Sequence, residues 1–175
     1  MAERCRVFFA LWPDPETQCQ LARLGKALHL EMGGRATRES SIHLTLAFLG
    51  DVNGEQLEGL HRIAADVVFQ PFTMSIDRSG CFAQSKVAWL APRTMPLPLL
   101  SLVEQLQGEL KQSGFRLEER PYTPHITVVR DAKCKRIEAS LVPVEWRVEA
   151  FVLVRSDLGK QPSPYSTIGR WPDRN

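Results

Sequence analysis

The same short pattern, His-x-Thr, occurs twice in this chain, as His43-Leu44-Thr45-Leu46 and as His125-Ile126-Thr127-Val128, 82 residues apart. The same offset brings the apolar run at residues 5–11 onto the run at residues 86–91, and the apolar stripes of the two helices that follow also coincide. Each half of the chain is therefore expected to form a strand, a helix and a second strand that carries the motif. Such a repeat predicts two lobes related by a pseudo-two-fold axis, with the motifs facing each other across a cleft.

The strand expected at residues 42–49 has one apolar face. Its even-numbered positions are all large and apolar: Ile42, Leu44, Leu46 and Phe48. Its odd-numbered positions begin with His43 and Thr45. Because alternate residues of a strand point to opposite faces, the even positions are expected in the core, and the imidazole and the hydroxyl side by side on the other face.

Other patterns along the chain predict the remaining elements. Asp14 before Pro15 is a typical helix start, and Asn53 with Gln56 three residues later resembles a capping box. Helices are expected at residues 15–30, 53–67 and 99–113. Further strands are expected at residues 72–76, 86–91, 115–117, 125–130, within 145–154 and at 165–171, with a turn of the chain in the region 79–85.

The charge balance excludes one class of nucleic-acid binder. Lys and Arg total 22 and Asp and Glu total 20, so the formal net charge is only +2. A protein that holds a polyanion by bulk charge carries a far larger basic excess, so any contact with RNA must come from a local patch. The apolar run near the N-terminus is too short for a secretory signal, and no stretch approaches the ~20 apolar residues of a membrane span. A cytoplasmic location without a membrane partner is expected.

The four cysteines, at positions 5, 19, 81 and 134, form no CxxC pair. This spacing indicates neither a zinc knuckle nor a redox motif. Buried or reduced cysteines are therefore expected, as is typical of a cytosolic protein, although two disulfides also remain compatible with the sequence.

Two histidines and two threonines that face one cleft fit general acid–base catalysis on a phosphodiester. A neutral imidazole can take a proton from the nucleophile and a protonated one can give a proton to the leaving oxygen, and an ordinary histidine pKa near ~6.5 lets both forms coexist near neutral pH. The threonine hydroxyls can donate hydrogen bonds to the non-bridging phosphate oxygens, where charge builds up in the transition state. This scheme needs neither a metal nor a cofactor.

Two other interpretations compete with this chemistry. A single strand histidine is often an ordinary core or surface residue, but the repetition of the motif argues against that here. A catalytic zinc site takes three protein ligands, and neither motif has a third ligand nearby. No metal site is therefore expected.

The complete set of motifs resembles the 2H phosphoesterases, which are named for two His-x-Thr motifs. Within them the chain is most similar to the bacterial RNA 2′,3′-cyclic phosphodiesterases, also called 2′-5′ RNA ligases. The resemblance covers nearly the whole chain and rests on segments 6–10, 42–50, 120–127 with Arg130, 155–159 and 165–171, in that order. The chain departs from the family pattern at Ser41, where Asn is frequent, and at Val128-Val129, where Leu followed by Leu or a small residue is common.

This resemblance implies an α+β fold, with one bilobal domain over residues 1–175. Two pseudo-symmetric lobes would place antiparallel sheets along a central cleft, with helices outside. It also implies metal-independent hydrolysis of RNA 2′,3′-cyclic phosphate ends to 2′-phosphates. His43 is assigned as the proton donor and His125 as the proton acceptor, although the symmetric sequence does not decide between them, and Thr45 and Thr127 would hold the phosphate. The family is also linked to 2′-5′ ligation, so RNA ends, those of tRNA halves among them, are the expected partner.

Further residues are expected beside the phosphate and the RNA. Strict alternation would turn Arg130 away from Thr127, but a bulge or the end of the strand would turn it toward the phosphate; the alternative is a solvated residue at the strand end. Phe9 could stack a terminal base or pack in the core, and loop arginines could supply the local basic patch or lie in solvent. The candidate RNA contacts are Phe9, Tyr122, Arg35, Arg38 and Arg120.

Two other functions remain compatible with the sequence. One is a non-catalytic module that binds RNA ends, and the other is a phosphodiesterase of a small cyclic or 2′-5′-linked nucleotide. The intact motifs favour an enzyme, since a binding module needs positive charge and stacking but no titrating pair. A monomer is expected because no coiled-coil or exposed repeat pattern occurs.

Overall fold

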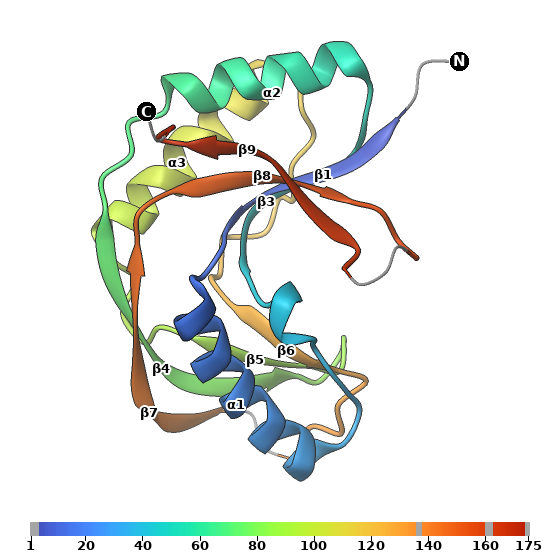
Figure 1. Cartoon of the computed structure of the whole chain (residues 1–175), viewed down its shortest axis with the longest axis vertical. Helices are drawn as coiled ribbons and strands as arrows, with labels where there is room; N and C mark the ends of the chain where they lie inside the picture. The colour runs from blue at the N-terminus through green and yellow to red at the C-terminus, as the bar shows by residue number, and fades with distance from the viewer. Residues whose placement is uncertain (1–3, 136–137, 160–162, 174–175) are drawn as a thin grey trace.

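The computed structural model describes residues 4–135, 138–159 and 163–173. These residues form helices α1 (Pro15–Met32), α2 (Gly54–Asp66) and α3 (Leu97–Gln112) and a short 3-10 helix, η1 (Glu39–Ser41) (Figure 1). The strands are β1 (Cys5–Leu11), β2 (Arg35–Ala36), β3 (Leu44–Val52), β4 (Phe72–Phe82), β5 (Val87–Ala91), β6 (Ile126–Arg130), β7 (Glu138–Val148), β8 (Phe151–Ser156) and β9 (Tyr165–Trp171). None of the helices in the described ranges has the length and apolar character needed to cross a membrane.

The strands form two antiparallel sheets, which lie one above the other in Figure 1. The four-stranded sheet has the order β3-β1-β8-β9, and the five-stranded sheet has the order β2-β6-β5-β4-β7. Strands β1 and β3 pair in the first sheet, and β5 and β6 pair in the second. The predicted α+β class with antiparallel sheets is therefore confirmed.

The predicted repeat is also confirmed, and its offset is accurate at the element boundaries. Helix α1 begins at Pro15 and α3 at Leu97, and β3 begins at Leu44 and β6 at Ile126, so both pairs start 82 residues apart. Each motif histidine stands immediately before its strand. The repeat therefore places the two histidines at equivalent points of the two sheets.

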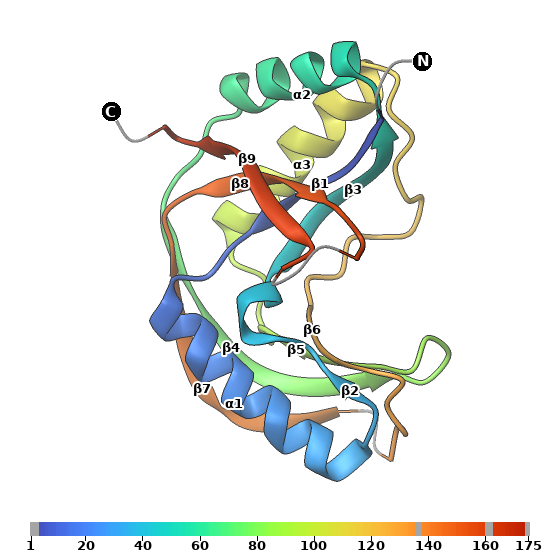
Figure 2. The same cartoon turned by 45° about the vertical axis from the view of Figure 1, so that its right-hand side comes forward.

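In each repeat, the helix packs against the sheet that does not contain the two strands it connects. Helix α1, which joins β1 to β3 of the four-stranded sheet, packs against β5, β6 and β7 of the five-stranded sheet. Helix α3, which joins β5 to β6, packs against β3. The turned view in Figure 2 shows α2 and α3 over the four-stranded sheet and α1 against the five-stranded sheet. A Cβ atom on Gly25 of α1 would lie 3.0 Å from the Val128 Cβ atom, so a glycine permits this close approach.

The helix starts follow the predicted capping chemistry. The Asp14 carboxylate accepts hydrogen bonds from the backbone N–H of Thr17 at 2.9 Å and from its hydroxyl at 2.7 Å. Both bonds lower the pKa of Asp14, and the bond from the Thr17 hydroxyl has the larger effect. Asn53 and Gln56 form the reciprocal capping box at the start of α2, which satisfies backbone donors that the helix itself leaves unpaired.

The helix-covered faces of the two sheets form the main core. Its largest fully buried side chains include Trp146, Phe9 and Phe151. A second, small cluster lies on the opposite face of the four-stranded sheet and contains Phe8, Ala10, Val152 and Val154. Phe9 and Phe8 therefore point to opposite faces, as adjacent strand residues do.

Two local predictions were wrong, one of them in part. The turn predicted at Ser79-Gly80 and Gln84-Ser85 is confirmed at Gln84-Ser85, within residues 83–86, but Ser79 and Gly80 lie within β4, where Gly80 pairs with Trp89 of β5 and Glu138 of β7. Ladder hydrogen bonds from two neighbouring strands outweigh the low strand preference of glycine. Residues 115–117 form no strand, and the Phe115 N–H instead bonds to the Leu110 carbonyl oxygen at the end of α3.

The cysteines also differ from the expected reduced state. Cys81, in β4, and Cys134, after β6, form a disulfide across a Cα–Cα distance of 5.6 Å. Cys5 and Cys19 carry free thiols and are partly buried. Residues 53 positions apart could not be paired from the sequence, because only the β4-β5-β6 arrangement brings them together.

Candidate active site

The two motif histidines lie where β3 and β6 approach each other. His43 precedes β3, at the edge of the four-stranded sheet, and His125 precedes β6 of the five-stranded sheet. The two strands contact each other although they belong to different sheets. The structure thus brings together the two motifs that the sequence repeat singled out.

Both imidazole rings are held in the same way. The Nδ1 atom of His43 lies 2.7 Å from the Ser41 carbonyl oxygen, and the Nδ1 atom of His125 lies 2.9 Å from the Thr123 carbonyl oxygen. A carbonyl oxygen can only accept, so Nδ1 carries the proton and donates in each case. Each neutral ring therefore keeps the lone pair on Nε2, the atom that remains for proton transfer.

The surroundings of the two rings differ. Trp12 stacks on His43 with parallel planes and a centroid distance of 4.9 Å, and the rings of Phe8 and Tyr165 lie 5.0 and 5.4 Å away. Burial lowers the pKa of His43 to about 4, and the positive charges of Arg130 and His125 act in the same direction. The Ser41 carbonyl opposes this shift but does not offset it. His43 is therefore neutral in the free protein at pH 7.

The predicted bulge in β6 is present and decides where Arg130 points. Thr127 pairs with Trp89, but Val129 pairs with Ala88, so Val128 is an extra residue in the strand. An extra residue reverses the alternation that follows it. Arg130 consequently lies on the same sheet face as Thr127, and its charge acts on His43.

An equivalent bulge occurs in β3. Thr45 pairs with Ala10 and Ala47 with Phe9, so Leu46, 82 residues before Val128, is the extra residue. This bulge moves Phe48 from the predicted core face to the face of Thr45, where it is 56% exposed. Phe48 occupies the repeat position of Arg130. Sequence reasoning missed this placement, although the repeat offset itself could have indicated it.

The structure decides the position of one candidate RNA contact. Phe9 is fully buried and packs against Phe151 and Trp171, with centroid distances of 6.1 and 6.2 Å, so of the two alternatives that the sequence left open it takes the core. Tyr122 donates its hydroxyl to the Thr45 carbonyl oxygen at 2.9 Å, and burial raises its pKa. Tyr122 therefore links the two motifs, and its contact with RNA stays a prediction.

The arginines predicted to form a basic patch are exposed. Arg35 of β2 pairs across the sheet with Arg130, and its guanidinium forms an ion pair with Asp131 at 2.8 Å. Arg120 forms an exposed ion pair with Glu118, and Arg38 is exposed just before η1. Their contact with RNA stays a prediction. Within the described ranges, no three His, Cys, Asp or Glu side chains come together as a metal site.

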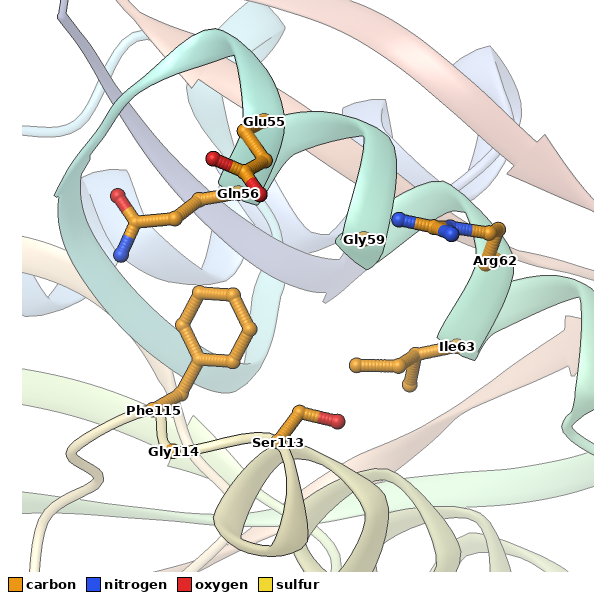
Figure 3. Close-up of a pocket in the computed structure, with 8 residues that line it drawn as sticks. All are labelled: Glu55, Gln56, Gly59, Arg62, Ile63, Ser113, Gly114 and Phe115. Carbon is orange, nitrogen blue, oxygen red and sulfur yellow. The ribbon is translucent and has the colours of Figure 1, made fainter.

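A surface depression of about 370 Å³ lies away from the motifs, between α2 and the end of α3 (Figure 3). It is lined by Glu55, Gln56, Gly59, Arg62, Ile63, Ser113, Gly114 and Phe115. None of these is a predicted site residue. Arg62 points along the exposed side of α2, which makes it a suitable control position for the experiments below.

Comparison with known proteins agrees with the geometry of the motifs. The family described as LigT like Phosphoesterase matches residues 11–89 and 90–165. The RNA 2′,3′-cyclic phosphodiesterase of Escherichia coli (strain K12) is 32% identical and covers 98% of both chains. A crystal structure of E. coli LigT complexed with 3′-AMP superimposes with a TM-score of 0.86 at 31% identity, over 97% of this chain and 98% of that one. A crystal structure of a Thermus thermophilus protein gives a TM-score of 0.76 at 26% identity, over 94% and 96%.

Proposed function

Because this chain belongs to the LigT-like phosphoesterase family, we propose that it hydrolyses the 2′,3′-cyclic phosphate end of RNA to a 2′-phosphate. The observation that carries the proposal is the matched pair of imidazoles, each with Nδ1 bound to a carbonyl two residues upstream. A pair of rings that both keep Nε2 for proton transfer suits a reaction that needs one base and one acid. Curated relatives from E. coli, Archaeoglobus fulgidus and Thermus thermophilus are named for this activity.

The proposed reaction exchanges one P–O bond for another. One imidazole takes a proton from water while the water oxygen bonds to phosphorus. The P–O3′ bond breaks, and the imidazolium of the other histidine gives its proton to O3′. The product carries a 2′-phosphate and a 3′-hydroxyl, and the two rings then return to their starting protonation states through solvent.

The surroundings of His43 fit one of the two roles. Burial lowers its pKa to about 4, which makes the neutral ring a weaker base and its imidazolium a stronger acid, and the negative charge of a bound phosphate favours the imidazolium form. We therefore propose the assignment implied by the family resemblance, with His43 as the proton donor and His125 as the proton acceptor.

Three further groups would bind the phosphate. Thr45 and Thr127 share a sheet face with their histidines, so their hydroxyls can donate to the non-bridging oxygens. The bulge at Val128 adds the Arg130 guanidinium to the same face. A charged donor of this kind forms stronger hydrogen bonds to a phosphate than a neutral one.

The test uses a short RNA with a 2′,3′-cyclic phosphate end, in excess EDTA, and identifies the position of the phosphate in the product. A 2′-phosphate formed at an undiminished rate in EDTA supports the proposed bond cleavage and its independence of metal. RNA that binds without conversion would refute hydrolysis and favour a binding module. Addition of an RNA with a 5′-hydroxyl tests for 2′-5′ ligation in the same assay.

A further inference from the structure

A row of side chains crosses the five-stranded sheet, starting from the second motif. Thr127 of β6 pairs with Trp89 of β5, Trp89 pairs with Gly80 of β4, and Gly80 pairs with Glu138 of β7. Directly paired residues of antiparallel strands place their side chains on the same face. This face is the one that carries the motif, because α1 covers the opposite face at Val128.

Aromatic rings and a guanidinium connect this row to the catalytic pair. The Phe82 ring meets His125 edge-on at a centroid distance of 5.2 Å and lies 5.4 Å from the Trp89 ring. The Arg78 guanidinium carbon lies 5.2 Å from the centre of the Trp89 ring. Phe82, Trp89 and Arg78 thus form a continuous group that begins at His125; we refer to it as the Phe82 group.

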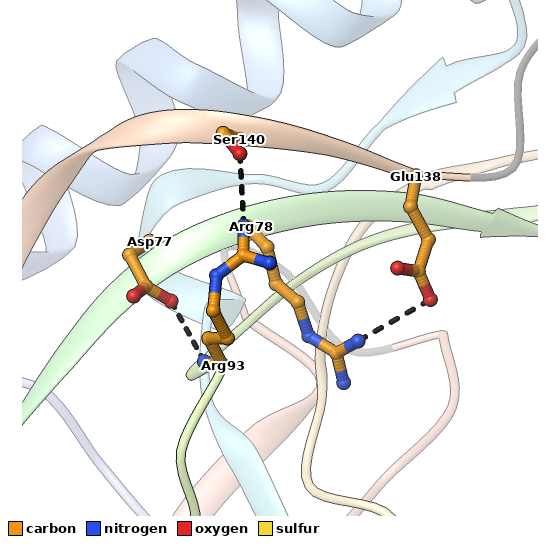
Figure 4. A network of polar contacts seen from close by, with 5 residues as sticks. All are labelled: Asp77, Arg78, Arg93, Glu138 and Ser140. Carbon is orange, nitrogen blue, oxygen red and sulfur yellow. Dashed lines mark hydrogen bonds and ion pairs between the residues drawn. The ribbon is translucent and has the colours of Figure 1, made fainter.

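The Arg78 side chain forms an ion pair and remains partly exposed to solvent. Its Nη1 atom donates to Glu138 at 3.2 Å, and its side chain is 24% exposed (Figure 4). The neighbouring Arg93 donates from its guanidinium to Ser140 and from its backbone N–H to Asp77, at 2.8 and 2.7 Å. The sheet therefore presents one guanidinium group, that of Arg78, over the Trp89 ring, with Glu138 as its acidic neighbour.

Two donors in this group lack an acceptor. Among the described residues, Arg78 Nε and Trp89 Nε1 are buried and have no hydrogen-bond partner. Buried donors are normally satisfied, so a group with two such donors gains free energy when an acceptor reaches it. Rotation of Arg78 away from Glu138 would bring its Nε donor to the surface, because the side chain is already 24% exposed.

Aromatic groups lie next to both histidines, whereas an RNA end has only one terminal base. Phe8, Trp12 and Tyr165 surround His43 on the four-stranded sheet, and the Phe82 group adjoins His125 on the other sheet. Among the described residues, the Phe82 group combines its rings with a stacked guanidinium, that of Arg78, which is what a nucleotide joined through a phosphodiester requires. An acceptor oxygen of that phosphodiester would also meet the Arg78 Nε donor that lacks a partner.

We propose that the Phe82 group binds the nucleotide on the 5′ side of the reacting one, with its base on the partly exposed Phe82 ring and its linking phosphate on Arg78, which the buried Trp89 ring supports. This subsite rests on the proposed hydrolysis of RNA ends. It makes an RNA chain, not a cyclic mononucleotide, the preferred substrate.

The test compares kcat/KM for adenosine 2′,3′-cyclic phosphate with kcat/KM for a diadenylate that ends in the same cyclic phosphate. Stacking of the added base and the contact of its linking phosphate with Arg78 are together expected to make the dinucleotide about tenfold better in the unaltered protein. In Arg78→Met, which keeps the aliphatic contact with Trp89, the dinucleotide-to-mononucleotide ratio is expected to fall toward one. In Glu138→Gln, which removes the competing carboxylate, the ratio is expected to rise. Arg62→Met, which removes an exposed arginine from α2, should leave the ratio unchanged.

The outcomes separate the subsite from the reaction. Hydrolysis of both substrates with a ratio near one in the unaltered protein would overturn the subsite and leave the proposed function standing. A ratio that is high but equal in Arg78→Met and Glu138→Gln would also overturn it. Hydrolysis of neither substrate would refute the proposed function and the subsite together. If Arg78→Met does not fold, the exposed Glu138→Gln variant carries the test alone, with the opposite sign.

Discussion

The aromatic surroundings of His43 should make the stability of the folded protein depend on pH. The unfolded chain has an ordinary histidine pKa of 6.5, whereas the pKa in the folded protein is lowered to about 4. As the pH falls below 6.5, the unfolded chain binds a proton that the folded chain does not bind until about pH 4. The free energy of unfolding must therefore decrease over this window and be independent of this group above about pH 7.5.

The size of this loss of stability follows from the difference between the His43 pKa values of the unfolded and folded chains. At about 1.4 kcal/mol per pKa unit, the difference between 6.5 and about 4 corresponds to at most about 3.5 kcal/mol. Since the ring is partly exposed, solvent screening reduces this value, and we expect about 2 kcal/mol. The perturbation that isolates it is His43→Asn, because the asparagine amide can still donate to the Ser41 carbonyl but does not titrate.

The assay is urea denaturation, followed by tryptophan fluorescence at pH 7.5 and at pH 4.5. The unaltered protein should lose about 2 kcal/mol more than His43→Asn between the two pH values. Carboxylates such as Asp14, whose pKa is also lowered, titrate in both proteins and cancel in the comparison. Equal losses in the two proteins, or an NMR titration of the His43 ring with a midpoint near 6.5, would refute the reasoning.

Three other predictions concern the site and its supports. A cyclic phosphate with sulfur in place of O3′ has a leaving group that needs no proton, so His43→Ala should recover most of its rate on this substrate, whereas His125→Ala should not. On the oxygen substrate each variant should lose roughly 10²- to 10⁴-fold in kcat/KM, and equal recovery by both would contradict the assigned roles. Tyr122→Phe removes a buried donor from a motif carbonyl and should lower the free energy of unfolding by about 1 kcal/mol in urea titrations; an unchanged midpoint would contradict the link. Reduction of Cys81–Cys134 opens a loop of about fifty residues and should cost about 4 kcal/mol, measured against a double alanine variant that must not respond to reductant.

The repeat made most of the architecture predictable. A single offset located two strands, a helix and a histidine in each half, because the duplicated segments keep the same hydrophobic period. The capping residues Asp14 and Asn53 indicated where two helices begin, since their bonds are local. Contacts made within a few residues were therefore accessible to sequence reasoning.

What the sequence did not show depends on contacts between distant segments. The bulge in β6 could be named as a condition for placing Arg130, but its existence follows from how β5 pairs with β6. The same kind of bulge in β3 turned Phe48 out of the core, against a clear alternation of apolar residues. Tyr122 became a link between the motifs because the carbonyl oxygen of Thr45, at the edge of a sheet, faces a residue 77 positions away.

The exchange of helices between the two sheets has a mechanical consequence. Helix α1 leaves the four-stranded sheet to cover the other one before the chain returns for β3, and α3 does the reverse before β6. A hinge motion that spread the sheets apart would have to bend the chain at the junctions between each helix and the strands of the other sheet. These junctions therefore restrain the separation of His43 and His125, and we expect catalysis to need side-chain rotation without a closing movement of one sheet toward the other.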